Sequence, residues 1–198
     1  MFALVESGSI TKYFSGNQSI VIGDNQYPKQ IFTLWSKAER EAIGVYEVEI
    51  NTANKKDEKW YYNTNLTCSF SNGKVTGSYG SATAKSINDL LFTAEDESAG
   101  KGTEGEVKSR GLKYNLIQTI KRQAAGELQK TDWYIVRKAD AGTAVPSAIT
   151  THRAAVRTKA AEQETAITNA ADTPALETLY TRDSDGVRPL GELPRLES

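Results

Sequence analysis

The chain has too few cysteines and histidines for several common kinds of site. Its 198 residues include one cysteine, Cys68, and one histidine, His152. A single cysteine excludes an internal disulfide and a cluster of thiolate metal ligands. A single histidine excludes a multi-histidine metal site and any mechanism that needs two histidines. We therefore expect neither a metal nor a cofactor.

An excess of charge of one sign is also missing. The sequence has 24 Lys+Arg and 25 Asp+Glu, for a formal net charge of −1, so no overall field attracts nucleic acid or an anionic membrane. The hydrophobic fraction of 38% is ordinary for a soluble globular protein. The first eight residues lack the basic segment and the long apolar run of a signal peptide. We expect a protein that stays in the cytoplasm where it is made.

Motifs that would carry catalysis or ion binding are incomplete. Residues 99–103, AGKGT, contain no contiguous Gly-Lys-Ser/Thr of a phosphate-binding loop. Residues 183–186, DSDG, lack the closing glutamate of a calcium loop. No nucleophile, base and orienting group can be assembled from the remaining residues. The sequence therefore predicts a protein that is not an enzyme.

Residues 1–80 show the pattern of a small antiparallel β-domain. Short β-favouring runs at 2–5, 10–14, 45–50, 66–70 and 75–79 are separated by turn residues, including the hairpin pair Asn72-Gly73. Between them, Ser36 and Glu39 form the S-x-x-E pattern of a capping box, which predicts a short inserted helix over 37–43, ended by Gly44.

The rest of the chain is predicted to be helical after a linker. Residues 81–106 are rich in small and charged residues, which favours a linker or hinge. Residues 107–182 then show helical periodicity, and residues 183–198 are expected to form an extended tail. The first helix has apolar residues at steps of four, and further helices begin near Asp132, Pro146 and Thr173. The fold class is therefore α+β.

Clustered aromatic residues leave two interpretations open. Trp60, Tyr61 and Tyr62 are consecutive, and Trp133 is followed by Tyr134. Amphipathic rings of this kind are candidates for a sugar or protein contact. For any single ring, a place in a small hydrophobic core is the more frequent outcome.

The helical half carries a resemblance to a known family. The run Thr131-Asp132-Trp133-Tyr134-Ile135-Val136-Arg137, then Pro146, then His152-Arg153-Ala154-Ala155-Val156-Arg157, is similar to the C-terminal signature of tail-fibre assembly proteins and related small tail-associated proteins of tailed bacteriophages. That signature is approximately D-W, a basic residue, a proline and Y-R-x-x-L-R. His152 replaces the aromatic residue and Val156 replaces the leucine.

The resemblance implies roles for the residues that carry it. Asp132 would cap the short helix, and Trp133 would bury its ring against the long helix, so that Trp133→Ala would cost about 3–5 kcal/mol. Arg137, Arg153 and Arg157 would either present a basic face to an acidic partner or bond neighbouring carbonyl groups. The expected interface residues are Asp132, Trp133, Arg137, Arg153, Arg157, Leu190 and Leu193.

The implied function is that of a non-enzymatic structural or adaptor component of the virion tail. Its partners would be other phage tail or fibre proteins and further copies of itself, with neither a membrane nor nucleic acid expected. A dissociable tail-fibre assembly chaperone is one alternative. A carbohydrate-binding module that uses Trp60, Tyr61 and Tyr62 for host attachment is another.

Overall fold

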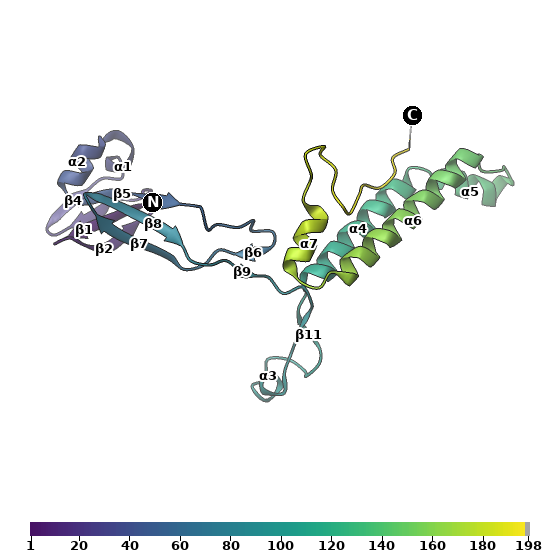
Figure 1. Ribbon diagram of the computed structural model, residues 1–198, viewed down its shortest axis with the longest axis horizontal. Helices are drawn as coiled ribbons and strands as arrows, with labels where there is room; N and C mark the ends of the chain where they lie inside the picture. Colours follow the sequence, from purple (N-terminus) through teal and green to yellow (C-terminus); the bar gives the residue numbers. More distant parts are fainter. Residues whose placement is uncertain (197–198) are drawn as a thin grey trace. The chain divides into compact units, whose positions relative to one another are not determined.

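The computed structural model describes residues 1–196 and has a mixed α+β fold (Figure 1). The predicted fold class is therefore confirmed. The chain divides into two compact units, Met1–Thr83 and Ala84–Ser198. The predicted boundary at residue 80 lies close to this division, and residues 84–106, predicted to be part of a linker, belong to the second unit.

The first unit is built on a five-stranded sheet with the order β2-β1-β5-β8-β7. Neighbouring strands are antiparallel except β5 and β8, which run parallel. The parallel pair arises because the chain leaves β5, forms β7 first and then returns as β8. The sheet strands are β1 (Phe2–Glu6), β2 (Ser9–Phe14), β5 (Val45–Asn51), β7 (Leu66–Ser71) and β8 (Lys74–Tyr79).

The predicted hairpin turn at Asn72-Gly73 is present, and a second tight turn joins β1 to β2. Asn72 and Gly73 have φ values of 50° and 72°, the left-handed pair that a type I′ turn requires. Ser7 and Gly8 connect β1 to β2 with φ values of 51° and 77°. These turns fix the registers of the two outer strand pairs of the sheet.

Short elements cover one face of this sheet. Helix α2 (Lys37–Ala42) has the predicted capping box between Ser36 and Glu39, and the hydrogen bonds from Ser36 lower the pKa of the Glu39 carboxyl. Helix α1 (Ile31–Leu34) was not predicted, because its four residues are held by the burial of Ile31 and Phe32 rather than by a local cap. The remaining short strands are β3 (Ile20–Ile22), β4 (Asn25–Tyr27), β6 (Tyr61–Tyr62) and β9 (Thr83–Ala84).

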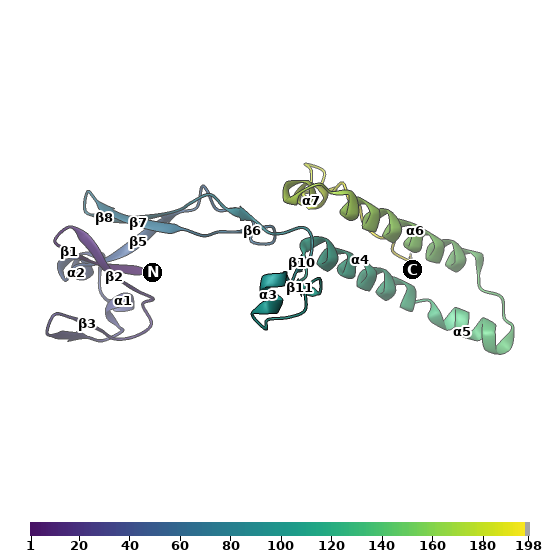
Figure 2. The ribbon, with the colours of Figure 1, turned by 90° about the horizontal axis from the view of Figure 1, so that it is seen from below.

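The second unit is organised around two long helices. Helices α4 (Leu112–Gln129) and α6 (Ser147–Asn169) lie side by side in both ribbon views (Figure 2). Helix α5 (Asp132–Ala141) follows α4 after a two-residue break, and α7 (Thr173–Tyr180) follows α6. The predicted apolar positions form the contact: Ile120 and Ala124 from α4, and Ile149, Val156, Ala160 and Ile167 from α6, are all buried.

The segment predicted to be a linker folds into an arm. Strands β10 (Leu90–Leu91) and β11 (Val107–Ser109) pair antiparallel, with helix α3 (Ala94–Ser98) between them. We call residues 89–110 the hairpin arm. Asp89 accepts from Arg110 at 2.6 Å and Asp96 accepts from Lys108 at 2.8 Å, so charge pairs close the arm at its base and near its tip.

The C-terminal segment returns to the helices of its own unit. Gln163 of α6 donates its side-chain amide to the carbonyl oxygen of Gly191 at 2.9 Å. The Leu190 amide donates to the carbonyl of Leu179 at 3.0 Å, and Arg188 pairs with Glu192. The predicted extended tail thus docks on its own unit through residues 188–193, and residues 197–198 of that prediction lie outside the described residues.

Candidate docking surface around α5

One arginine joins the two sequence segments that carry the phage-protein resemblance. Nη1 of Arg153 donates to the carbonyl oxygen of Leu128 at 2.7 Å, to Oγ1 of Thr131 at 2.7 Å and to Oδ1 of Asp132 at 2.8 Å. The Arg153 residue is 8% exposed and Thr131 is fully buried. Arg153 of α6 therefore fixes the break between α4 and α5.

The cap of α5 differs from the prediction. Thr131 is at the N-cap position, but its hydroxyl donates to the carbonyl oxygen of Leu128 instead of accepting from the helix. Asp132 is the first residue of α5 and its carboxylate receives Arg153. The implied capping role of Asp132 is therefore wrong, because Asp132 lies one position inside the helix and Thr131 occupies the N-cap position.

Trp133 does not anchor the short helix. The residue is 51% exposed, and its ring lies against Tyr134, 3.9 Å between centroids, and against the guanidinium of Arg137, 4.6 Å away. The predicted burial against α4 is wrong because α5 lies beyond the end of α4, where no helix covers it (Figure 2).

Helix α5 instead leaves a group of apolar side chains in solvent. Trp133, Ile135 and Val136 are all exposed, Val136 by 66%, and no residue of this ten-residue helix is buried. We call these three residues the α5 patch. Trp133 and Val136, three residues apart, are neighbours on the helix surface, whereas Ile135 lies on another side of the helix. Exposed large apolar side chains are candidates for a contact surface, and tryptophan is among the residues enriched at binding hot spots.

The three predicted interface arginines have different roles. Arg153 takes the structural alternative, bonding a carbonyl and two side chains of its own chain. Arg137 is half-buried against the two rings of α5, and Arg157 is exposed. Within residues 1–196, neither Arg137 nor Arg157 forms a salt bridge, so their charges remain available to a partner beside the α5 patch.

The two leucines predicted to clasp a partner are engaged within the chain. Leu190 is 3% exposed, which corrects its assignment as an interface residue. Leu193 is half-buried and lines a hollow with Gly126 and Lys130 of the α4 end. Both side chains are covered because the C-terminal segment folds back onto α4, α6 and α7.

Two of the three side chains in the aromatic run of the first unit are buried. Trp60 and Tyr61 are buried, and Tyr62 is exposed. The ammonium groups of Lys59 and Lys56 lie 4.3 Å and 4.5 Å from the rings of Trp60 and Tyr61. A sugar needs open ring faces to stack on, so the assignment of Trp60 and Tyr61 as ligand aromatics is corrected to core residues, as the alternative interpretation had it.

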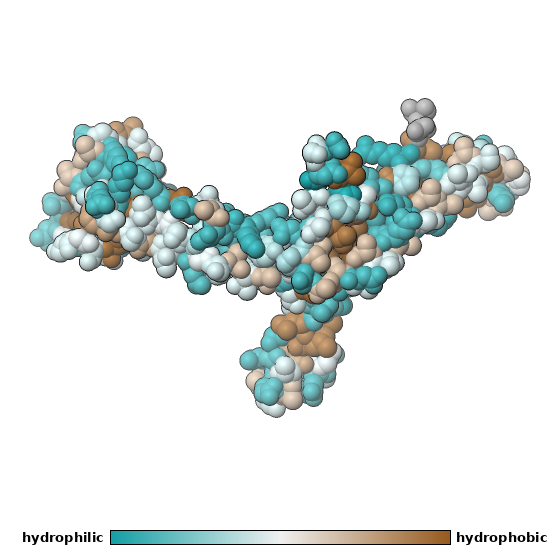
Figure 3. All heavy atoms as spheres, viewed as in Figure 1, coloured by the Kyte–Doolittle hydropathy of each residue, from teal (hydrophilic) through white to brown (hydrophobic). Residues whose placement is uncertain are grey.

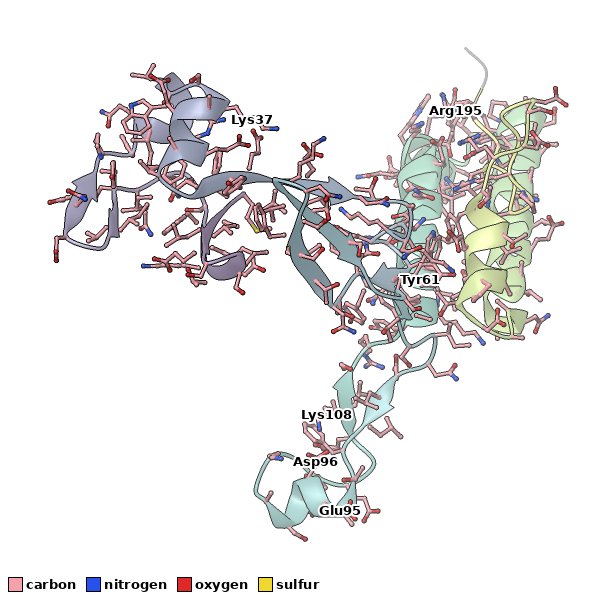
Figure 4. All side chains as sticks on the ribbon, turned by 60° about the vertical axis from the view of Figure 1, so that its left-hand side comes forward. Lys37, Tyr61, Glu95, Asp96, Lys108 and Arg195 are labelled. Carbon is pink, nitrogen blue, oxygen red and sulfur yellow. The ribbon has the colours of Figure 1, made fainter. Side chains whose placement is uncertain are left out.

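The hairpin arm is a surface that sequence reasoning missed. Figure 4 shows Asp96 and Lys108 facing each other on it, and this contact holds the pKa of the Asp96 carboxyl below its usual value. At the base, the Gly111 amide and Arg110 do the same for Asp89. The apolar run Leu90-Leu91-Phe92 was the available signal, because a flexible linker rarely contains one.

The other candidate motifs have plain structural explanations. The Asp183 carboxylate accepts from the amides of Asp185 and Val187 and so closes a turn. Across residues 1–196 no group of three potential metal ligands is placed so that it could hold an ion, and no helix is long and apolar enough to cross a bilayer.

Comparison of the chain with protein-family models, with curated proteins and with solved structures finds no match.

Proposed function

We propose that this protein is a non-enzymatic structural or adaptor component of a bacteriophage tail, acting by docking on other tail or fibre proteins. The second unit supplies one docking surface through the α5 patch. The first unit, with its own core and sheet, supplies an attachment to a different tail protein.

The observation that carries the proposal is the state of α5. A helix containing tryptophan, isoleucine and valine buries none of them, while Arg153 holds the start of this helix through three contacts. A helix that carries exposed apolar side chains and is fixed at one end is suited to binding a protein with little loss of conformational entropy. The residues that carry the resemblance to tail-associated proteins are the same residues that build this surface.

The test is the copy number of the chain in purified virions of the phage that encodes it, measured by quantitative mass spectrometry against a major tail protein. A fixed stoichiometry supports a tail component. Presence in the infected-cell lysate with absence from virions favours the dissociable assembly chaperone. Absence from tail-associated complexes of either kind overturns the proposal.

A pair of variants connects the result to α5. Val136→Glu places a charge in the α5 patch, whereas Val187→Glu makes the same change at an equally exposed valine of the C-terminal segment. Virions made with Val136→Glu are expected to contain less of the protein, and those made with Val187→Glu the normal amount. Equal incorporation of both variants would show that α5 is not the docking surface.

A further inference from the structure

The hairpin arm presents a second uncovered apolar surface in the same unit as the α5 patch. Leu90, Leu91 and Val107 are all exposed, Leu90 by 52%. Figure 3 shows hydrophobic side chains gathered where β10 and β11 pair. A two-stranded hairpin of this size gains little stability from its own backbone, so a partner that covers these side chains would also stabilise the arm.

The arm is acidic. Residues 89–110 contain six carboxylates, at Asp89, Glu95, Asp96, Glu97, Glu104 and Glu106, and three cations, at Lys101, Lys108 and Arg110. The three cations are already paired with Asp89 and Asp96. The other four carboxylates are exposed and, within the described part of the chain, form no salt bridge.

The α5 end of the unit has the opposite charge. Residues 131–157 contain four cations, at Arg137, Lys138, Arg153 and Arg157, and two carboxylates, at Asp132 and Asp140. One cation and one carboxylate, Arg153 and Asp132, neutralise each other. The unpaired charged groups of residues 131–157 are therefore three cations and Asp140, which makes this segment basic.

The two surfaces cannot meet within one chain. The arm leads into the first residue of α4 and α5 follows its last turn, so the 18 residues of α4 separate them. At 1.5 Å per residue this helix is about 27 Å long. Figure 1 shows the arm and α5 at opposite ends of α4.

We propose that a second copy of this chain covers the α5 patch with its hairpin arm, in a head-to-tail contact. The hairpin arm and the α5 end each have exposed apolar side chains at the centre, and the charges that flank these side chains are of opposite sign on the two surfaces. The two surfaces are therefore complementary. The inference rests on the proposed docking role of the α5 patch and names its partner. Because the two surfaces differ, a dimer keeps one free arm on one copy and one free α5 patch on the other, so further copies can add to build rings or filaments.

The test is sedimentation velocity of the full-length chain from about 5 to about 500 µM, the range in which modest interfaces dissociate. The wild type is expected to pass from a 21.7 kDa monomer to dimers and larger species, and higher salt should reduce this association because the flanking charges are exposed. Val136→Glu and Leu90→Lys should each remain monomeric, since each places a repelling charge at the centre of one surface. Val187→Glu should behave as the wild type.

Mixing the two monomeric variants gives the decisive result. The Val136→Glu chain keeps an intact arm and the Leu90→Lys chain keeps an intact α5 patch, so the mixture should associate although neither variant does so alone. All four proteins should have the same far-UV circular dichroism spectrum, because the substituted side chains are exposed.

Three outcomes overturn the inference. The first is a wild type that stays monomeric over the whole concentration range, and the second is a mixture of the two variants that stays monomeric. The third is association of Leu90→Lys as in the wild type while Val136→Glu stays monomeric. That result would mean that α5 pairs with the α5 of another copy. These results are independent of the virion copy number. A monomer found at fixed stoichiometry in virions would refute self-association alone, and an associating chain absent from tail complexes would refute the tail role alone.

Discussion

The arginine that joins α6 to the start of α5 gives the sharpest test of how the second unit is built. Nη1 of Arg153 carries two protons, which three acceptors on Leu128, Thr131 and Asp132 share. The Arg153→Met variant keeps a side chain of similar length and removes all three contacts. The Thr131 hydroxyl is then left buried with one partner fewer.

The expected loss of stability follows from these contacts. A hydrogen bond to a charged group contributes about 1.5–3 kcal/mol, and the pair with Asp132, whose side chain is largely exposed, adds at most about 1 kcal/mol. The Leu128 carbonyl keeps its bonds from the amide and hydroxyl of Thr131. We therefore expect Arg153→Met to cost about 2–4 kcal/mol, and Asp132→Ala less than about 1 kcal/mol.

The assay is urea denaturation of the full chain followed by far-UV circular dichroism, with amide hydrogen exchange to locate the change. Exchange should accelerate first at residues 131–141, which Arg153 holds. The matched control is Arg157→Met, one helical turn later and exposed, which should stay within about 0.5 kcal/mol of the wild type. If Arg153→Met unfolds at the same urea concentration as Arg157→Met, the reasoning about the joint is refuted.

Three further predictions concern single residues. Trp133→Ala should lower the free energy of unfolding by about 1 kcal/mol, because the variant loses the half-exposed contact between the Trp133 ring and Arg137. A loss near about 4 kcal/mol would mean that the Trp133 side chain is buried. Gly126→Ala should stabilise α4 by about 0.5–1 kcal/mol, since no atom lies near the new methyl group. Gly111→Ala should destabilise the protein, because its methyl group would lie 2.3 Å from the backbone carbonyl carbon of Asn88. Because the folded-state pKa of Asp96 is lowered from 3.8, its stabilising effect is present at neutral pH and lost as pH falls below that value. Amide exchange in the hairpin arm should accelerate at this low pH beyond the intrinsic change, and Asp96→Asn should reduce that pH dependence, leaving the part that comes from Asp89.

The elements that sequence patterns predicted are those with a strong local signal. The hairpin turn at Asn72-Gly73 and the capping box at Ser36 require particular residues at fixed spacing, and both are present. Helix α6 was predicted from its Pro146-Ser147 start and from apolar positions that all proved to be buried. In each case the information lies within one or two turns of backbone.

The predictions that failed depend on contacts between distant segments. The environment of Trp133 is set by where α6 begins relative to the end of α4, which no pattern near residue 133 records. Leu190 is buried because Gln163, 27 residues earlier, binds the backbone beside it. The hairpin arm was taken for a linker because its charge pairs span 12 to 21 residues and its strands are only two and three residues long.

The structure separates two roles that the sequence signature combines. Within the D-W and R-x-x-V-R segments, Asp132 and Arg153 bind each other and fix the helix break, whereas Trp133 and Arg157 are turned to solvent. A residue that holds the joint affects docking through the stability of α5, and an exposed residue affects docking with only a small change in stability, of about 1 kcal/mol or less. A signature of this kind can therefore persist for the fold of the joint while the exposed positions vary with the partner. The proposed docking role therefore rests on Trp133 and its neighbours in α5, whereas Arg153 belongs to the scaffold that presents them.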